Sequence, residues 1–262
     1  MCEIVGCRSL GRPSGRILSL RNMIKALLFD VFGTVLDWRS SVIDELTAFG
    51  NTHRIELDWA DVADRWRAGF REHQRRIAHA EARFMRMDEV HRRVLDSMFA
   101  DLGVAGVPEA DLEALNRAWH RLRPWPDAVA GLLRLKERHI VAALSNGNLA
   151  LLVDVSKHAG LPWDCVFSSA LFSSYKPDPA VYWGAAKMLE IAPHEAMMVA
   201  AHAYDVDAAR EIGLQTAYVF RADEHGPGRG EDPGDTSRFD LAVGDFLELA
   251  DALGSRASDS ST

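Results

Sequence analysis

Four short polar clusters in this sequence each follow a run of apolar residues. They hold Asp30, then Ser145 with Asn146, then Lys176, and last His202 with Asp205. A carboxylate can serve as a nucleophile, and an ammonium group nearby keeps it ionised. Hydroxyl and imidazole groups add hydrogen-bond donors and acceptors. These residue types suit covalent catalysis by a carboxylate.

The apolar runs before these clusters have the length of buried strands. They span 24–29, 140–144, 165–168 and 196–201, and a further run spans 216–220. Helical patterns lie between them at 126–138, 149–159, 178–190 and 205–212, two of them followed by the capping residues Gly160 and Gly213. The alternation predicts an α/β, Rossmann-like fold, a parallel sheet with helices on both faces. The site of such a sheet lies beyond the carboxyl ends of its strands.

The length of 262 residues exceeds a typical single domain and favours an insertion. From about residue 40 to 118 the apolar residues follow a helical period, with dense Arg and His and no strand-like run. We expect an all-helical cap at 39–118, inserted into a core made of 23–38 and 119–250. Two segments are expected outside these units: a disordered extension or misassigned start at 1–22 and a flexible tail at 251–262. A solvated loop is expected within the core at 222–238.

Composition narrows the class of partner. The net charge is −8 with no basic stripe, so the sequence argues against nucleic acid. No stretch approaches the roughly 18 apolar residues of a membrane span. The three cysteines, Cys2, Cys7 and Cys165, are too scattered for a disulfide framework or a paired-cysteine zinc site. We expect a cytoplasmic protein without a membrane partner.

Four motifs in order carry a family resemblance. They are Phe29-Asp30-Val31-Phe32-Gly33-Thr34, Leu144-Ser145-Asn146-Gly147, Tyr175-Lys176-Pro177-Asp178-Pro179 and Val199-Ala200-Ala201-His202-Ala203-Tyr204-Asp205. Together they resemble the haloacid dehalogenase superfamily over about residues 24–250. The stretch that continues from Thr34 as Val-Leu-Asp-Trp-Arg-Ser-Ser is similar to the L-2-haloacid dehalogenases.

Two positions separate the dehalogenases of this superfamily from its phosphatases. The resembling phosphatases carry an acid two residues after the nucleophile and a metal-binding Asp in the fourth motif; here these positions hold Phe32 and Ala201. Without them a site is poorly equipped for phosphoryl transfer, whereas a halide leaves without a proton. The sequence therefore predicts a metal-independent dehalogenase with no cofactor. A phosphatase-like hydrolase and a non-catalytic binding protein of the same fold remain as alternatives.

The resemblance implies hydrolysis of short 2-haloacids, such as chloroacetate, fluoroacetate and 2-halopropionate, to 2-hydroxy acids. Asp30 displaces the halide and forms an ester, which water then hydrolyses. Lys176 pairs with Asp30, Thr34 orients it, and Asp205 orients or activates the water. The expected substrate contacts are Ser145, Asn146 and the backbone N–H groups of Val31 and Phe32 for the carboxylate, Arg67 for the halide, and Tyr182 near the nucleophile. The partners are thus a haloacid and water, and a homodimer stays open.

Several of these residues also have structural interpretations. Arg67 fits a solvated helical face, Tyr182 a core position, and Asp205 a helix N-cap. Family members carry Ser-Ser-Asn where this chain has Ala200-Ala201-His202. His202 also fits a purely structural role. We expect His202 to narrow the pocket and to offer an N–H to departing fluoride.

Overall fold

The computed structural model describes residues 23–78 and 81–254, so the expected extension at 1–22 and the end of the expected tail lie outside it. Six parallel strands form the main sheet in the order β5-β4-β1-β6-β7-β8. They are β1 (Ala26–Phe29), β4 (Ile140–Ser145), β5 (Cys165–Ser168), β6 (Ala196–Ala200), β7 (Gln215–Val219) and β8 (Leu241–Val243). The sequence predicted five of these strands to within two residues.

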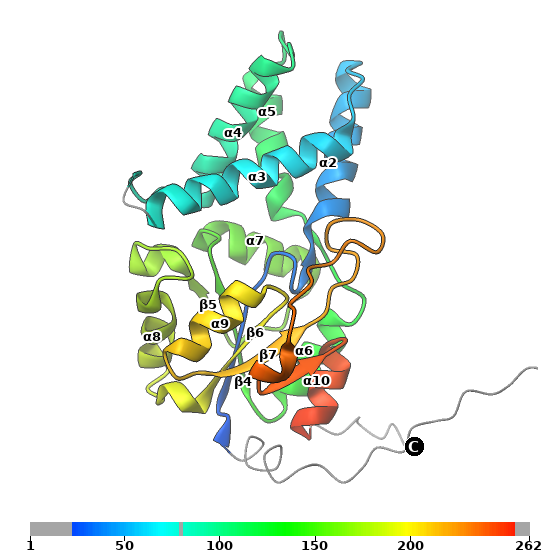
Figure 1. Ribbon diagram of the computed structural model, residues 1–262. Helices are drawn as coiled ribbons and strands as arrows, with labels where there is room; N and C mark the ends of the chain where they lie inside the picture. Colours follow the sequence, from blue (N-terminus) through cyan, green and yellow to red (C-terminus); the bar gives the residue numbers. More distant parts are fainter. Residues whose placement is uncertain (1–22, 79–80, 255–262) are drawn as a thin grey trace, which may run out of the picture.

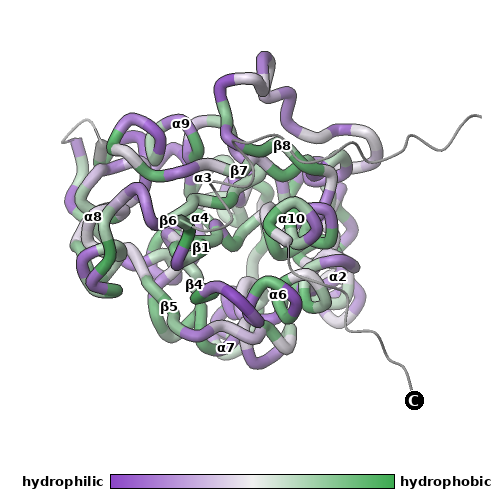
Figure 2. The backbone as a smooth tube through the Cα atoms, turned by 90° about the horizontal axis from the view of Figure 1, so that it is seen from below, coloured by the Kyte–Doolittle hydropathy of each residue, from purple (hydrophilic) through white to green (hydrophobic). Residues whose placement is uncertain are grey.

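Helices cover both faces of the sheet, as expected (Figure 2). On one face lie α6 (Ala128–Lys136), α7 (Leu149–Ala159) and α10 (Phe246–Leu253), and on the other α8 (Pro179–Met188) and α9 (Ala203–Glu211). Successive side chains of a strand point to opposite faces. Leu27 and Phe29 therefore join the first core and Leu28 the second. This two-sided burial explains why β1 is a continuous apolar run.

A helical cap stands above the carboxyl ends of the strands (Figure 1). It contains α2 (Trp38–His53), α3 (Trp59–Ala78), α4 (Met87–Asp101), α5 (Glu109–Asn116) and the short 3₁₀ helix η1 (Arg117–His120). The buried side chains of α3 include Val62, Trp66 and Phe70, spaced by four residues as the helical period requires. An antiparallel pair of two-residue strands, β2 (Leu36–Asp37) and β3 (Arg123–Pro124), joins the cap to the core.

The C-terminal part of the core differs from the expectation. Strand β8 and helix α10 were not predicted, and α10 continues through residues 251–253, where a flexible tail was expected. Leu249 and Leu253 of α10 are buried against the sheet, so their burial orders this segment. Three further 3₁₀ helices lie in the connections: η2 (Ser169–Phe172), η3 (Pro193–Glu195) and η4 (Thr236–Arg238). Across the described part of the chain, no helix has the length and apolar character needed to cross a membrane.

Candidate active site

Asp30 lies directly after β1, which pairs with neighbours on both sides in the middle of the sheet. Its backbone N–H donates to the carbonyl oxygen of Val199 at 3.0 Å. The Thr34 hydroxyl donates to Asp30 Oδ2 at 2.8 Å and accepts from the N–H of Ala201 at 2.9 Å. Backbone and side chain of Asp30 are thus both fixed.

Lys176 lies between two buried carboxylates. Its Nζ is 2.9 Å from Asp30 Oδ1 and 2.5 Å from Asp205 Oδ2. The other oxygen of Asp205 accepts from the Tyr182 hydroxyl at 2.5 Å. Asn146 holds the backbone of Lys176 by two hydrogen bonds, of 2.8 and 3.2 Å. Groups that follow four strands, β1, β4, β5 and β6, thus hold one ammonium group beside Asp30.

His202 provides a third donor to Asp30. Its Nδ1 lies 3.2 Å from Asp30 Oδ2, and its Nε2 lies 3.0 Å from Oε1 of Glu224. The same Glu224 oxygen accepts from the Trp38 indole at 3.1 Å. Gly33 has a φ of +93°, and a Cβ there would lie 2.2 Å from Glu224 Oε1. Glycine thus lets Glu224 approach the turn that carries the nucleophile.

The charges of this cluster stabilise one another. Burial raises the pKa of Asp30, but Lys176 and His202 outweigh it and hold that pKa below its usual value. Burial lowers the pKa of His202, and the charges of Glu224 and Asp30 reverse this and raise it to about 10. Burial raises the pKa of Glu224, and His202 lowers it to about 2. At neutral pH, Asp30 is therefore an anion and His202 an imidazolium that donates through both nitrogens.

Arg67 reaches from α3 toward this cluster. Its guanidinium lies 5.9, 5.6 and 5.8 Å from the ring centres of Phe32, Trp38 and Phe70. Burial lowers its pKa to about 10, and its buried Nε has no hydrogen-bond partner. An unpartnered charged donor in a nearly dry site favours an anionic ligand.

A cavity of about 20 Å³ lies between Arg67 and Asp30. Its walls include six of the predicted site residues: Asp30, Phe32, Arg67, Ser145, Asn146 and His202. Among the described residues, no hydrogen bond uses the backbone N–H of Val31 or Phe32, so both remain available to a ligand. The cavity is therefore small and bordered by hydrogen-bond donors.

The other predicted residues lie behind the cavity wall. Lys176 and Thr34 contact Asp30, whereas Tyr182, predicted to contact substrate, is buried and donates to Asp205 instead. Asp205 does not cap a helix: it lies in the first turn of α9, after the N-cap position at His202. These groups can act only through Asp30 and Lys176.

Two expectations for the rim need correction. His202 was expected to offer an N–H to fluoride, but both ring nitrogens already face Asp30 and Glu224. Glu224 falls in the segment 222–238 expected to be solvated, yet its side chain is 1% exposed. Glu224 could not be predicted from the sequence because its partners, Trp38 and His202, lie far from it along the chain. Acidic residues in a Gly- and Pro-rich stretch give no local sign of burial.

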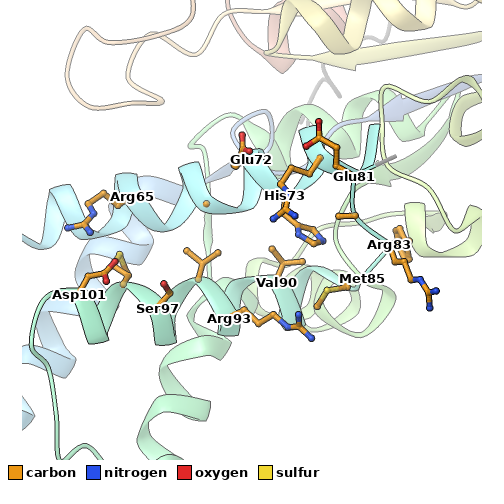
Figure 3. Close-up of a pocket in the computed structure, with 16 residues that line it drawn as sticks. Arg65, Glu72, His73, Glu81, Arg83, Met85, Val90, Arg93, Ser97 and Asp101 are labelled. Carbon is orange, nitrogen blue, oxygen red and sulfur yellow. The ribbon is translucent and has the colours of Figure 1, made fainter. Parts of the chain in front are cut away.

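A larger cavity, of about 850 Å³, lies elsewhere, between α3 and α4 of the cap (Figure 3). Arg65, Glu72 and His73 of α3 border it, with Arg93 of α4. No predicted site residue lines it, so the chemistry described above belongs to the smaller cavity.

The donor set around Asp30 does not suit a magnesium ion. Mg²⁺ requires about six oxygen ligands at close distances. Here the side chains at the two distinguishing positions, Phe32 and Ala201, offer no oxygen, and the Lys176 ammonium already occupies the space between Asp30 and Asp205. Within the described ranges, no group of three potential ligand side chains is arranged for a metal ion.

Comparison with known proteins identifies the class. The family of haloacid dehalogenase-like hydrolases matches residues 24–213, and the chain belongs to it. Within that class it is a member of the L-2-haloacid dehalogenase family, enzymes that hydrolyse carbon–halide bonds. The comparisons therefore support the predicted dehalogenase over the phosphatase-like and non-catalytic alternatives.

Three solved structures illustrate the relationship. A crystal structure of an L-2-haloacid dehalogenase is 43% identical, with a TM-score of 0.85, over 89% of this chain and 100% of that chain. A defluorinating L-2-haloacid dehalogenase is 40% identical, with a TM-score of 0.85, over 88% of this chain and 95% of that chain. The L-2-haloacid dehalogenase from Xanthobacter autotrophicus with chloropropionic acid covalently bound is 25% identical, with a TM-score of 0.73, over 90% of this chain and 100% of that chain.

Proposed function

We propose that the protein hydrolyses short 2-haloacids to 2-hydroxy acids through an ester on Asp30, without a metal ion. The observation that carries the proposal is the ionised Asp30 carboxylate, held by Lys176, Thr34 and His202 and facing the unpartnered Arg67 across a small cavity. The covalently bound chloropropionic acid in the Xanthobacter autotrophicus relative supports a covalent route.

In the first step, Asp30 attacks the halogen-bearing carbon. Oδ2 of Asp30 already has two donors, Thr34 and His202, whereas Oδ1 has one, Lys176. Oδ1 therefore keeps a lone pair for attack. A C–O bond forms, the carbon–halogen bond breaks, and the halide departs with its electron pair toward Arg67, whose charged donors are preorganised for it.

In the second step, water attacks the carbonyl carbon of the Asp30 ester. Negative charge then develops on Oδ2, which Thr34 and His202 already contact at 2.8 and 3.2 Å. These donors stabilise the tetrahedral intermediate. The bond from the carbonyl carbon to Oδ1 breaks, and Oδ1 leaves in the product as a hydroxyl group with one proton of the attacking water. The other proton is released as Asp30, which now holds an oxygen from water, becomes a carboxylate again. Asp205 and Tyr182 serve as positioning residues for Lys176.

The substrates we propose are chloroacetate, fluoroacetate and 2-halopropionate. A cavity of about 20 Å³ has room for about one water molecule, so every haloacid requires the walls to move, and two-carbon acids require the least movement. The defluorinating relative supports fluoroacetate as a substrate. The backbone N–H groups of Val31 and Phe32, with Ser145 and Asn146 at the cavity wall, bind the carboxylate by charge-assisted hydrogen bonds.

Halide release from chloroacetate and fluoroacetate, with and without EDTA, tests this function. We expect full activity in EDTA and a loss of several orders of magnitude in Asp30→Asn, whereas Asp44→Asn, at a surface carboxylate, keeps wild-type activity. A single turnover in ¹⁸O-water should label Asp30 and leave the product unlabelled. Label appearing directly in the product would overturn the ester mechanism. Phosphate release that requires Mg²⁺ would support the phosphatase-like reading.

A further inference from the structure

Three arginines on α3, Arg67, Arg71 and Arg76, lack a carboxylate partner within the described ranges, and the first two line the cavity at Asp30. Within the described ranges, neither Arg67 nor Arg71 has a carboxylate oxygen within 4.0 Å, whereas Arg75 of the same helix lies 2.7 Å from Glu72. Arg67 and Arg71 are four residues apart and so lie on one face of the helix. Neither guanidinium therefore forms a direct ion pair with the described residues.

Arg71 lies where two cavities meet. The inner cavity contains Asp30, and an outer pocket of about 750 Å³ lies between α3 and the segment that follows η2. Three side chains line both: Arg71, Gln74 and Tyr204. Arg71 and Tyr204 are exposed, so this partition between the two spaces is accessible from solvent.

The charges near the reaction site cancel until Arg71 is included. Three acidic side chains face three basic ones: Asp30, Asp205 and Glu224 against Lys176, His202 and Arg67. Arg71 adds one positive charge at the partition. A monocarboxylate anion beside it would restore the balance.

The outer pocket also contains two carboxylates, and both are already engaged. Asp178 accepts from the N–H of Ala180 at the start of α8, at 2.9 Å. Glu231 accepts from the N–H of Ala203 at the start of α9, at 2.6 Å. Helix N-termini compensate negative charge. The unpaired charge that an entering anion meets is therefore the positive one of Arg71.

We propose that the outer pocket is the entrance for substrate, that Arg71 captures the carboxylate of the incoming haloacid, and that Arg71, Gln74 and Tyr204 form a gate to the Asp30 cavity. The substrate named here rests on the proposed function. Capture costs little reorganisation because Arg71 breaks no ion pair to bind the anion. The gate opens by movement of the side chains of Arg71 and Gln74, which are long and flexible.

Kinetics of Arg71→Gln with chloroacetate test the gate, with Arg75→Gln as the matched control. Both arginines lie on α3 and line the outer pocket, but only Arg75 is already paired. We expect KM to rise about tenfold in Arg71→Gln, the order expected for a lost hydrogen bond to a charged group, and kcat to change less than KM. In wild type, kcat/KM should fall with added salt, and this dependence should flatten in Arg71→Gln only. Equal effects in both variants, or none, would overturn the proposal.

Binding of acetate to the intact protein separates this proposal from the proposed function. Calorimetry should show acetate binding about tenfold weaker in Arg71→Gln and unchanged in Arg75→Gln. If the wild type releases halide from no haloacid while acetate binding still depends on Arg71, the proposed function fails and the gate stands. If turnover is normal and neither KM nor acetate binding depends on Arg71, the gate alone fails.

Discussion

Replacing Glu224 by glutamine tests whether the positive charge on His202 takes part in the reaction. The substitution keeps the shape of the side chain and removes its charge. Glu224 is almost fully buried and contacts the Nε2 of His202 at 3.0 Å and the indole of Trp38 at 3.1 Å. An amide oxygen can keep both contacts, so the structural disturbance is small and the electrostatic one is large.

The size of the effect follows from the pKa of His202. It is about 10 in the protein against the ordinary 6.5, a difference worth about 5 kcal/mol at about 1.4 kcal/mol per pH unit. Two carboxylates, Glu224 and Asp30, overcome the opposing effect of burial. If Glu224 supplies about half of this stabilisation, its removal lowers the pKa of His202 to about 8. Coulomb's law for the charges of Glu224 and His202 at 3.0 Å, with an effective dielectric constant of about 20, gives about 5 kcal/mol. An interaction of that size would place the pKa of His202 in the variant lower still.

The assay is the dependence of kcat for chloroacetate on pH. Because the imidazolium is lost as pH rises through its pKa, wild-type activity should persist until about pH 10. In Glu224→Gln the activity should already fall near pH 8, which gives a loss of about tenfold or more at pH 9 and little loss at pH 6. In the proposed mechanism His202 stabilises the intermediate of ester hydrolysis, so mass spectrometry should find Asp30 esterified in the variant at pH 9.

Glu211→Gln, at an exposed carboxylate on α9, is the control and should follow the wild-type profile. An unchanged basic limb in Glu224→Gln would show that the proton on His202 is not required. If the basic limb of the pH profile shifts in Glu224→Gln but no ester accumulates on Asp30, His202 acts in halide displacement and not in ester hydrolysis.

Three further outcomes are expected. Gly33→Ala should lower the free energy of unfolding by about 1–3 kcal/mol, measured in urea, because its φ of +93° is strained for alanine and its Cβ displaces Glu224. Arg67→Lys should lower kcat for chloroacetate at least about tenfold, since a lysine cannot reproduce the planar fork; an unchanged kcat would return Arg67 to a structural role. His120→Gln should lower the free energy of unfolding by about 1–2 kcal/mol below pH 6.5, because the protonated ring binds two carboxylates. The loss should shrink as pH rises through the raised pKa of His120. An equal loss at pH 6 and pH 9 would show that the charge on His120 does not contribute.

The sequence is informative where local pattern and function coincide. Asp30 and Ser145 could be placed at the rim because a buried parallel strand is an unbroken apolar run, and the first polar residue after it lies at the sheet's carboxyl edge. Arg67 was found through the family resemblance alone, since its helix carries other arginines of the same appearance.

Other features depend on contacts that no local pattern reveals. Glu224 is buried through Trp38, which precedes it by 186 residues, and through His202. Arg71 differs from Arg75 in lacking a nearby carboxylate and in lining the Asp30 cavity, and both are properties of the folded chain. The two-residue strands β2 and β3 are too short to produce an alternating pattern. Strand β8 and helix α10 do have apolar spacing, but they follow a loop rich in glycine and proline, and no strand or helix was predicted after that loop.

The pair of two-residue strands between cap and core separates two kinds of evolutionary change. Asp30, Lys176 and His202 come from the core, whereas Arg67, Arg71 and Gln74 come from α3 of the cap. Under the proposed mechanism and entrance, substitutions on α3 would alter which acids enter and which halide is accepted while the ester chemistry stays intact. Substitutions at the strand ends would change the rate for every substrate at once. Selection for activity on a new halogenated acid is thus expected to produce substitutions mainly in α3.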